Sequence, residues 1–144
     1  MMDTLAAMAL MAVLSAIAVP NFSALGEQYR LTSAANQVAY EITWARMQAI
    51  GQHASMRLRL VNDASYVRER STDGGLTWAQ AEPPTPLPSG VRMSTGGSGG
   101  PTFNRNGIAA AATTITVWNG RGTKSVATNL LGRVTVSVAG GQTG

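Results

Sequence analysis

The sequence predicts an α+β fold, in which one long N-terminal helix carries an antiparallel β-sheet on its C-terminal half. Three features support this prediction. Uncharged apolar residues are concentrated at the N-terminus, a helical spacing of apolar residues continues to Gly51, and a period-two alternation begins after Gly51. A chain of 144 residues can bury one core, so we expect a single globular unit with an appendage.

The N-terminal segment is the most apolar part of the chain. Residues 4–26 carry no charge, and residues 5–19 are nearly all Leu, Ala, Met, Val and Ile. This run is short for a membrane-spanning helix of about 20 residues, and a signal peptide is the alternative interpretation. No basic segment precedes the run in this sequence, however, and a helical pattern follows it where a signal peptide would lead into a polar loop. We therefore expect residues 1–25 to form a transmembrane or filament-core helix, and residues 26–144 to form a globular domain.

The helical pattern continues beyond this segment as an amphipathic helix. Six apolar residues, here called the core stripe, are spaced four, three, four, three and four apart: Leu31, Ala35, Val38, Ile42, Ala45 and Ala49. Gly51 is the expected end of a single kinked helix over residues 5–51, which would be roughly 70 Å long. Tyr40, Trp44 and Met47 lie beside the stripe, and we expect them to pack in the core or against the sheet.

A hairpin rich in arginine is predicted after the helix. Met56, Leu58 and Leu60 alternate with Arg57, Arg59 and Val61, and residues 66–70 form a second strand after a turn at Asn62-Asp63. A symmetric register places Arg59 opposite Arg68 and Arg57 opposite Arg70, so that four arginines share one face. Because like charges directly opposite each other destabilise a sheet, either an anionic partner compensates them or the register is shifted by one residue.

Shorter strands are predicted over residues 91–94, 114–118, 125–127 and 133–138, which brings the sheet to about six strands. A turn at Asp73-Gly74-Gly75 leads into residues 76–78. Pro83, Pro84, Pro86 and Pro88 indicate a loop that cannot join a central strand.

One motif within the apolar helix is specific enough to identify a family. The run Ala16-Ile17-Ala18-Val19-Pro20-Asn21-Phe22 resembles the N-terminal helix of type IV pilins and type II secretion pseudopilins. In that alignment Asp3 falls on the acidic position of the family. The resemblance implies that Asp3 and Pro20 belong to the assembly helix, and that Asp3 meets the N-terminal amine of a neighbouring subunit. An ordinary helix N-cap is the alternative role for Asp3.

The resemblance extends over nearly the whole chain. Ala45-Arg46 before an arginine-bearing strand, the Asp73-Gly74-Gly75-x-x-Trp78 turn, Phe103-x-x-x-Gly107 and a late Gly132-Arg133 strand are similar to the GspH/FimT domain. The alignment places Met1 at the third residue of a mature pilin, which a processed start, a truncated start or a start codon assigned too late would each explain. Some competence minor pilins carry a Gly-Arg-x-Arg tail motif associated with DNA binding, and residues 132–135 keep only its first arginine, Arg133.

The residues needed for catalysis or metal binding are scarce. The chain has one histidine, His53, and no cysteine, and its acids are scattered among turns and arginines. The glycines of residues 96–100 lack the lysine and helix that follow a phosphate-binding loop. We therefore expect no enzyme activity, no catalytic or metal site and no cofactor. We expect His53 to interact with the last carbonyls of the helix.

The expected function is that of a minor pilin or pseudopilin. It would span the bacterial inner membrane once, with its globular domain in the periplasm, and would join other pilins or pseudopilins in a filament; methylation belongs to the same family expectation. The alternative is a minor pilin that binds DNA for uptake through Arg57, Arg59, Arg68, Arg70 and Arg133. The net charge of +4, carried by ten arginines and one lysine against seven acids, favours an anionic partner or forms a solvated surface. A major pilin is the third interpretation.

Overall fold

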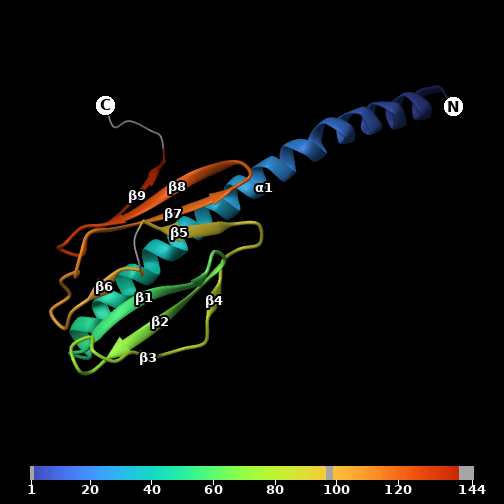
Figure 1. Cartoon of the computed structure of the whole chain (residues 1–144). Helices are drawn as coiled ribbons and strands as arrows, with labels where there is room; N and C mark the ends of the chain where they lie inside the picture. Colours follow the sequence, from blue (N-terminus) through green and yellow to red (C-terminus); the bar gives the residue numbers. More distant parts are fainter. Residues whose placement is uncertain (1, 97–98, 140–144) are drawn as a thin grey trace, which may run out of the picture.

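The computed structural model describes residues 2–96 and 99–139, and it confirms the predicted α+β architecture (Figure 1). A single helix, α1, spans Met2–Gly51 and contains 50 residues. Nine strands follow it in two antiparallel sheets. The first half of α1 projects away from the sheets, and the second half lies along them. We call the two sheets and the half of α1 that contacts them the head.

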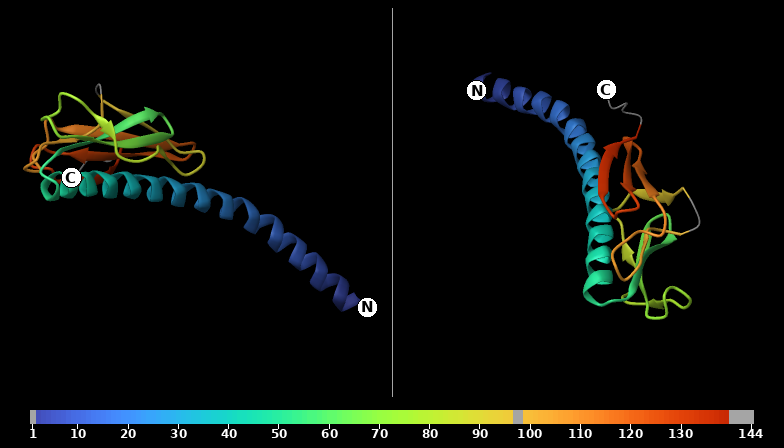
Figure 2. Two further views of the ribbon diagram at one scale, coloured as in Figure 1. Left: turned by 90° about the horizontal axis from the view of Figure 1, so that it is seen from below. Right: turned by 90° about the vertical axis from the view of Figure 1, so that its left-hand side faces the viewer.

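The core stripe of α1 is buried as predicted. All six of its residues are at most 4% exposed, and Ala34 is buried with them. The helix continues through Pro20 and curves gently between its projecting half and the head, where the sequence predicted a kink (Figure 2). Two of the three neighbours of the stripe differ from the prediction, because Tyr40 and Met47 are each 66% exposed. Only Trp44 packs against the core.

The helix ends at Gly51, as predicted, and a capping turn follows it. His53 has a φ of 49°, which places it in the left-handed region. Its N–H donates to the carbonyl of Ile50 at 3.4 Å, and the N–H of Ala54 donates to the carbonyl of Ala49 at 3.2 Å. These two bonds form a Schellman motif, in which glycine is the usual left-handed residue. The main chain of His53 therefore caps the helix, while its side chain is exposed.

The strands form two sheets, where the sequence predicted one. Sheet A contains β1 (Ser55–Asn62), β2 (Ser65–Ser71), β3 (Ala79–Gln80), β4 (Thr85–Pro86) and β6 (Thr102–Phe103), in the order β3-β2-β1-β6 with β4 also paired to β2. Sheet B contains β5 (Arg92–Thr95), β7 (Thr113–Asn119), β8 (Gly122–Thr128) and β9 (Val134–Val138), in the order β5-β7-β8-β9. Every predicted strand is present, and the sequence missed the two-residue strands β3, β4 and β6.

Both sheets pack on the same helix. The core joins the stripe of α1 to Met56, Leu58 and Tyr66 of sheet A and to Ile115, Val117 and Val126 of sheet B. Helix α1 contacts β1 and β6 of sheet A and β7, β8 and β9 of sheet B. The second half of α1 therefore packs against both sheets of the head (Figure 2).

Candidate assembly helix and anion-binding residues

The projecting half of α1 exposes nearly all of its large apolar side chains. These are Met2, Leu5, Met8, Leu10, Met11, Val13, Leu14, Ile17, Val19, Phe22 and Leu25. The most apolar 18-residue window of α1 has a mean hydropathy of 2.0, and none of it is buried. By length and composition, α1 can cross a membrane.

Asp3 lies in the first turn of this helix and is exposed. It precedes the uncharged residues 4–26, so the next ionisable side chain is that of Glu27. A carboxylate at the head of an apolar helix is costly in lipid unless a partner neutralises it. Pro20, the other predicted assembly residue, lies within α1.

The arginine hairpin has a different register from the symmetric one. Arg57 pairs with Glu69 and Arg59 with Val67, whereas Arg68 lies opposite Leu58. Arg70 in turn lies opposite Met56. Because side chains alternate between the two faces of a strand, Arg57 and Arg59 lie on one face of the hairpin, and Arg68 and Arg70 lie on the other. The prediction that four arginines share one face is therefore wrong, and the one-residue shift is what the structure adopts.

On the outer face of sheet A, one acid neutralises two arginines. Glu69 Oε2 accepts from Arg57 Nε at 2.5 Å, and Glu69 Oε1 accepts from Arg59 Nε at 2.8 Å. Burial of Glu69 opposes its ionisation, but the hydrogen bonds from Arg59 and Arg57 outweigh it and lower the pKa of the carboxyl. The Arg57 guanidinium also lies 4.2 Å from the centre of the Trp78 ring.

A capped turn places Trp78 over Arg57. Asp73 Oδ1 accepts from Ser71 Oγ at 2.5 Å and from the N–H of Leu76 at 3.0 Å, and Asp73 Oδ2 accepts from Thr77 Oγ1 at 2.5 Å. These hydrogen bonds stabilise the ionised form, so they hold the pKa of the exposed Asp73 carboxyl well below its usual range. The turn thereby leads the chain from β2 back to β3 with Trp78 against the hairpin.

On the inner face, Arg68 connects the sheet to the helix. Its Nε lies 3.4 Å from Glu41 Oε2 on α1, and its Nη2 donates to Glu82 Oε2 at 2.5 Å. Its guanidinium lies 4.2 Å from the centre of the Trp44 ring. Nearby, Gln37 Nε2 donates to the buried Tyr66 hydroxyl at 2.8 Å. Burial, assisted by the negative charge of Glu41, raises the pKa of Tyr66. Arg68 is therefore part of the packing between α1 and sheet A.

The remaining two predicted arginines are exposed. Within residues 2–96 and 99–139, neither the side chain of Arg70 nor that of Arg133 makes a hydrogen bond, an ion pair or a ring contact. Arg133 precedes β9 in sheet B, where its main-chain N–H donates to Asn129 Oδ1 at 2.8 Å. The five predicted arginines are thus divided between two faces of sheet A and an end of sheet B, and they do not form one surface.

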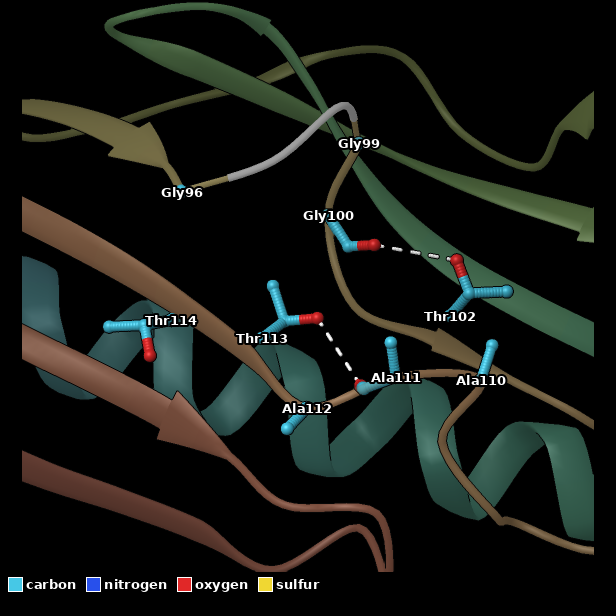
Figure 3. Close-up of a pocket in the computed structure, with 9 residues that line it drawn as sticks. All are labelled: Gly96, Gly99, Gly100, Thr102, Ala110, Ala111, Ala112, Thr113 and Thr114. Atoms are coloured by element: carbon cyan, nitrogen blue, oxygen red, sulfur yellow. Dashed lines mark hydrogen bonds between the residues drawn. The ribbon is translucent and has the colours of Figure 1, made fainter.

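A hollow of about 490 Å³ lies beside the glycine-rich segment (Figure 3). Glycine, alanine and threonine line it, and two threonine hydroxyls bond to nearby carbonyls of Gly100 and Ala111 at 3.4 Å. None of the described residues that line it is charged. In the described part of the chain, no group of three or more His, Asp or Glu side chains could hold a metal ion.

Comparisons with known proteins relate the fold to pilins. No protein-family model and no curated protein matches the sequence. Among solved structures, the minor pseudopilin EpsH from the type 2 secretion system of Vibrio cholerae matches with a TM-score of 0.63 and 12% identity, over 78% of this chain and 99% of EpsH. The type IV minor pilin FimU of Pseudomonas aeruginosa matches with a TM-score of 0.64 and 15% identity, over 78% of this chain and 92% of FimU. The chain therefore has the fold of these minor pilins and pseudopilins.

Proposed function

We propose that this chain is a minor pilin or pseudopilin that assembles through its N-terminal helix into a type IV pilus or a type II secretion pseudopilus. In this role it is a structural subunit and not an enzyme. The main observation behind the proposal is that one half of α1 is apolar and exposed, whereas the other half packs against the sheets of a pilin-like head. Before assembly, the apolar half would span the bacterial inner membrane once, with the head in the periplasm.

The free energy available from burying the exposed apolar side chains of α1 supports this proposal. Burying one large apolar side chain is worth about 1.5–3 kcal/mol, so the projecting residues together represent tens of kcal/mol. That total exceeds the net stability of a typical domain, about 5–15 kcal/mol. The helix therefore needs lipid or other apolar helices around it, and a membrane followed by a filament core provides both in turn.

Truncation tests this division. Deleting residues 1–25 should give a soluble, folded head, because the core stripe begins at Leu31 and keeps its packing against both sheets. The full chain should fractionate with membranes and require detergent for extraction. An unfolded truncation, or a full chain that is soluble without detergent, would show that the division is wrong.

Asp3 is proposed as an assembly residue within this helix. The motivation is its position as a lone acid ahead of the uncharged residues 4–26. Asp3→Ala should insert into the membrane normally but enter filaments less often, because only the pairing between subunits is lost. Asp3→Asn keeps the size and capping ability of the side chain and should fail in the same way. Incorporation equal to that of the wild type would reduce Asp3 to a helix cap.

DNA binding for uptake is a second proposal, and it is favoured by the observation that the side chains of Arg70 and Arg133 have no partner among the described residues. Arg57, Arg59 and Arg68 are engaged by acids, so they have less charge to offer to phosphates. The chain in neutral detergent should then retard duplex DNA at low salt, with affinity falling steeply as salt rises. Replacing Arg70 and Arg133 with alanine should weaken binding more than replacing Arg57 and Arg59. Absence of binding at low salt would remove this function.

A further inference from the structure

A groove of about 460 Å³ lies between the last turns of α1 and the edge of sheet A. Trp44, Gln48 and Gln52 line it from the helix, and Arg70, Gln80 and Glu82 line it from the sheet. The groove belongs to the head, so its chemistry is separate from that of the apolar helix.

The sheet side of this groove is an unpaired strand edge. β3 is the terminal strand in the order of sheet A, and Gln80 lies opposite Glu69 of β2. The N–H of Ala81 donates to the carbonyl of Arg68 at 2.9 Å. Because hydrogen-bonded and non-hydrogen-bonded pairs alternate along an antiparallel ladder, the N–H and C=O of Gln80 point away from β2. The edge therefore presents a main-chain donor and a main-chain acceptor.

The side chains of the groove favour an acidic ligand. Arg70 is exposed and has no ion pair in the parts of the chain that the structure describes. Glu82, the acid on the same wall, already accepts from Arg68 at 2.5 Å. Gln52 Nε2 donates to Gln48 Oε1 at 2.5 Å, and this bond leaves the Gln48 amide N–H groups to donate to a carboxylate or a carbonyl. Trp44, whose ring the Arg68 guanidinium contacts, contributes an aromatic side chain to the wall of the groove.

We propose that this groove binds an extended acidic segment of another polypeptide, which adds to β3 as a further antiparallel or parallel strand and places a carboxylate on Arg70. A polypeptide is favoured over a nucleic acid because its main chain carries the donor and the acceptor that the outward N–H and C=O of Gln80 require. A channel between a strand edge and a helix also holds an extended chain without moving either wall. Arginine then selects the carboxylate through charge-assisted hydrogen bonds.

Fluorescence anisotropy on the full chain in a neutral detergent tests this inference. The probe is a labelled, capped octapeptide that alternates valine with glutamate, and its twin carries glutamine in place of glutamate. The glutamate peptide should bind, and the glutamine twin should bind about tenfold more weakly or worse, since a hydrogen bond to a charged group carries that much affinity. Arg70→Gln should lose a similar factor for the glutamate peptide. Arg133→Gln removes another exposed arginine, next to β9, whose side chain has no partner among the described residues, and this variant should bind as the wild type does.

Gln80→Pro separates strand addition from simple attraction of charge. Proline removes the outward N–H but no hydrogen bond to β2, so sheet A should be kept while peptide binding is lost. Without any substitution, the Gln80 amide should exchange its hydrogen more slowly when the glutamate peptide is bound. Failure of the glutamate peptide to bind, equal binding of both peptides, or unchanged exchange at Gln80 would each overturn the proposal. Displacement of the peptide by an equimolar oligothymidylate would overturn it in favour of a nucleic-acid site.

Discussion

Removal of Arg68 should destabilise the head more than removal of any other arginine of the hairpin. The Arg68 side chain is 15% exposed and lies 3.4 Å from Glu41, a helix residue that is 9% exposed. Glu41 Oε2 has no hydrogen bond of its own, so Arg68→Ala leaves a buried carboxylate without compensation. Breaking a buried ion pair in this way costs about 3–5 kcal/mol. The loss of stacking on Trp44 adds to this cost, whereas the half-exposed Glu82 adds less than about 1 kcal/mol.

Denaturant unfolding of the full chain in detergent, monitored by tryptophan fluorescence, measures this loss. The denaturant concentration at the midpoint should fall, and the dependence of the unfolding free energy on denaturant should stay unchanged. Arg70→Ala is the matched control on the same strand and should cost less than about 0.5 kcal/mol, because Arg70 is exposed and unpaired. Replacing Glu41 with glutamine in the Arg68→Ala background should recover part of the loss, since the uncompensated charge is then absent. If Arg68→Ala and Arg70→Ala lose equal stability, or if the double variant recovers nothing, the buried pair does not hold α1 to sheet A.

Three further substitutions test other parts of the head. His53→Gly should raise stability by about 0.5–1 kcal/mol in thermal unfolding, because glycine adopts the left-handed φ of 49° without strain, whereas His53→Ala should not. The pKa of Glu69 is lowered in the folded state, so this side chain stabilises the head above its ordinary pKa of 4.5, and the stabilisation is lost as the pH falls below that value. Glu69→Gln should therefore be less stable than the wild type at pH 7 and should lose less stability on acidification. Parallel plots of stability against pH for the two proteins would contradict this. Gly100→Ala would bring a Cβ to 1.7 Å from the carbonyl oxygen of Leu58, so we expect a loss of at least about 1–3 kcal/mol in denaturant unfolding, whereas Gly120→Ala meets nothing within 4 Å and should be neutral.

Periodicity was sufficient to predict the helix, the longer strands and the core stripe. The stripe from Leu31 to Ala49 and the alternation from Met56 to Leu60 are local patterns, and each identifies a buried face without knowledge of its partner. Tyr40 and Met47 show the limit of this reasoning. They lie beside the stripe, but the two sheets do not extend far enough around the helix to cover them.

The sequence left two alternatives for the hairpin arginines, an anionic partner or a register shifted by one residue, and it could not decide between them because the register depends on a bulge and the position of Arg68 on a distant contact. The register of the hairpin shifts between Leu60 and Asn62, where the Asn62 side chain accepts from the N–H of Ala64 at 2.8 Å. That single extra residue exchanges the two faces of one strand relative to the other. Arg68 then lies beside Glu41 of α1, and the alternation of residues along a strand does not predict such a contact with the helix.

The packing of both sheets on one helix also determines when the head can fold during synthesis. The apolar half of α1 leaves the ribosome before the strands do, whereas the core stripe in the second half of α1 packs in a core that includes β8, and α1 contacts β8 and β9, which end at Thr128 and Val138. The stripe therefore stays partly uncovered until β8 and β9 have been synthesised, and the formation of contacts between segments so distant in sequence is slow. Stalled chains that end before β8 should thus be inserted in the membrane yet have heads that proteases digest. Under the proposed function, membrane insertion of α1 would therefore precede completion of the head.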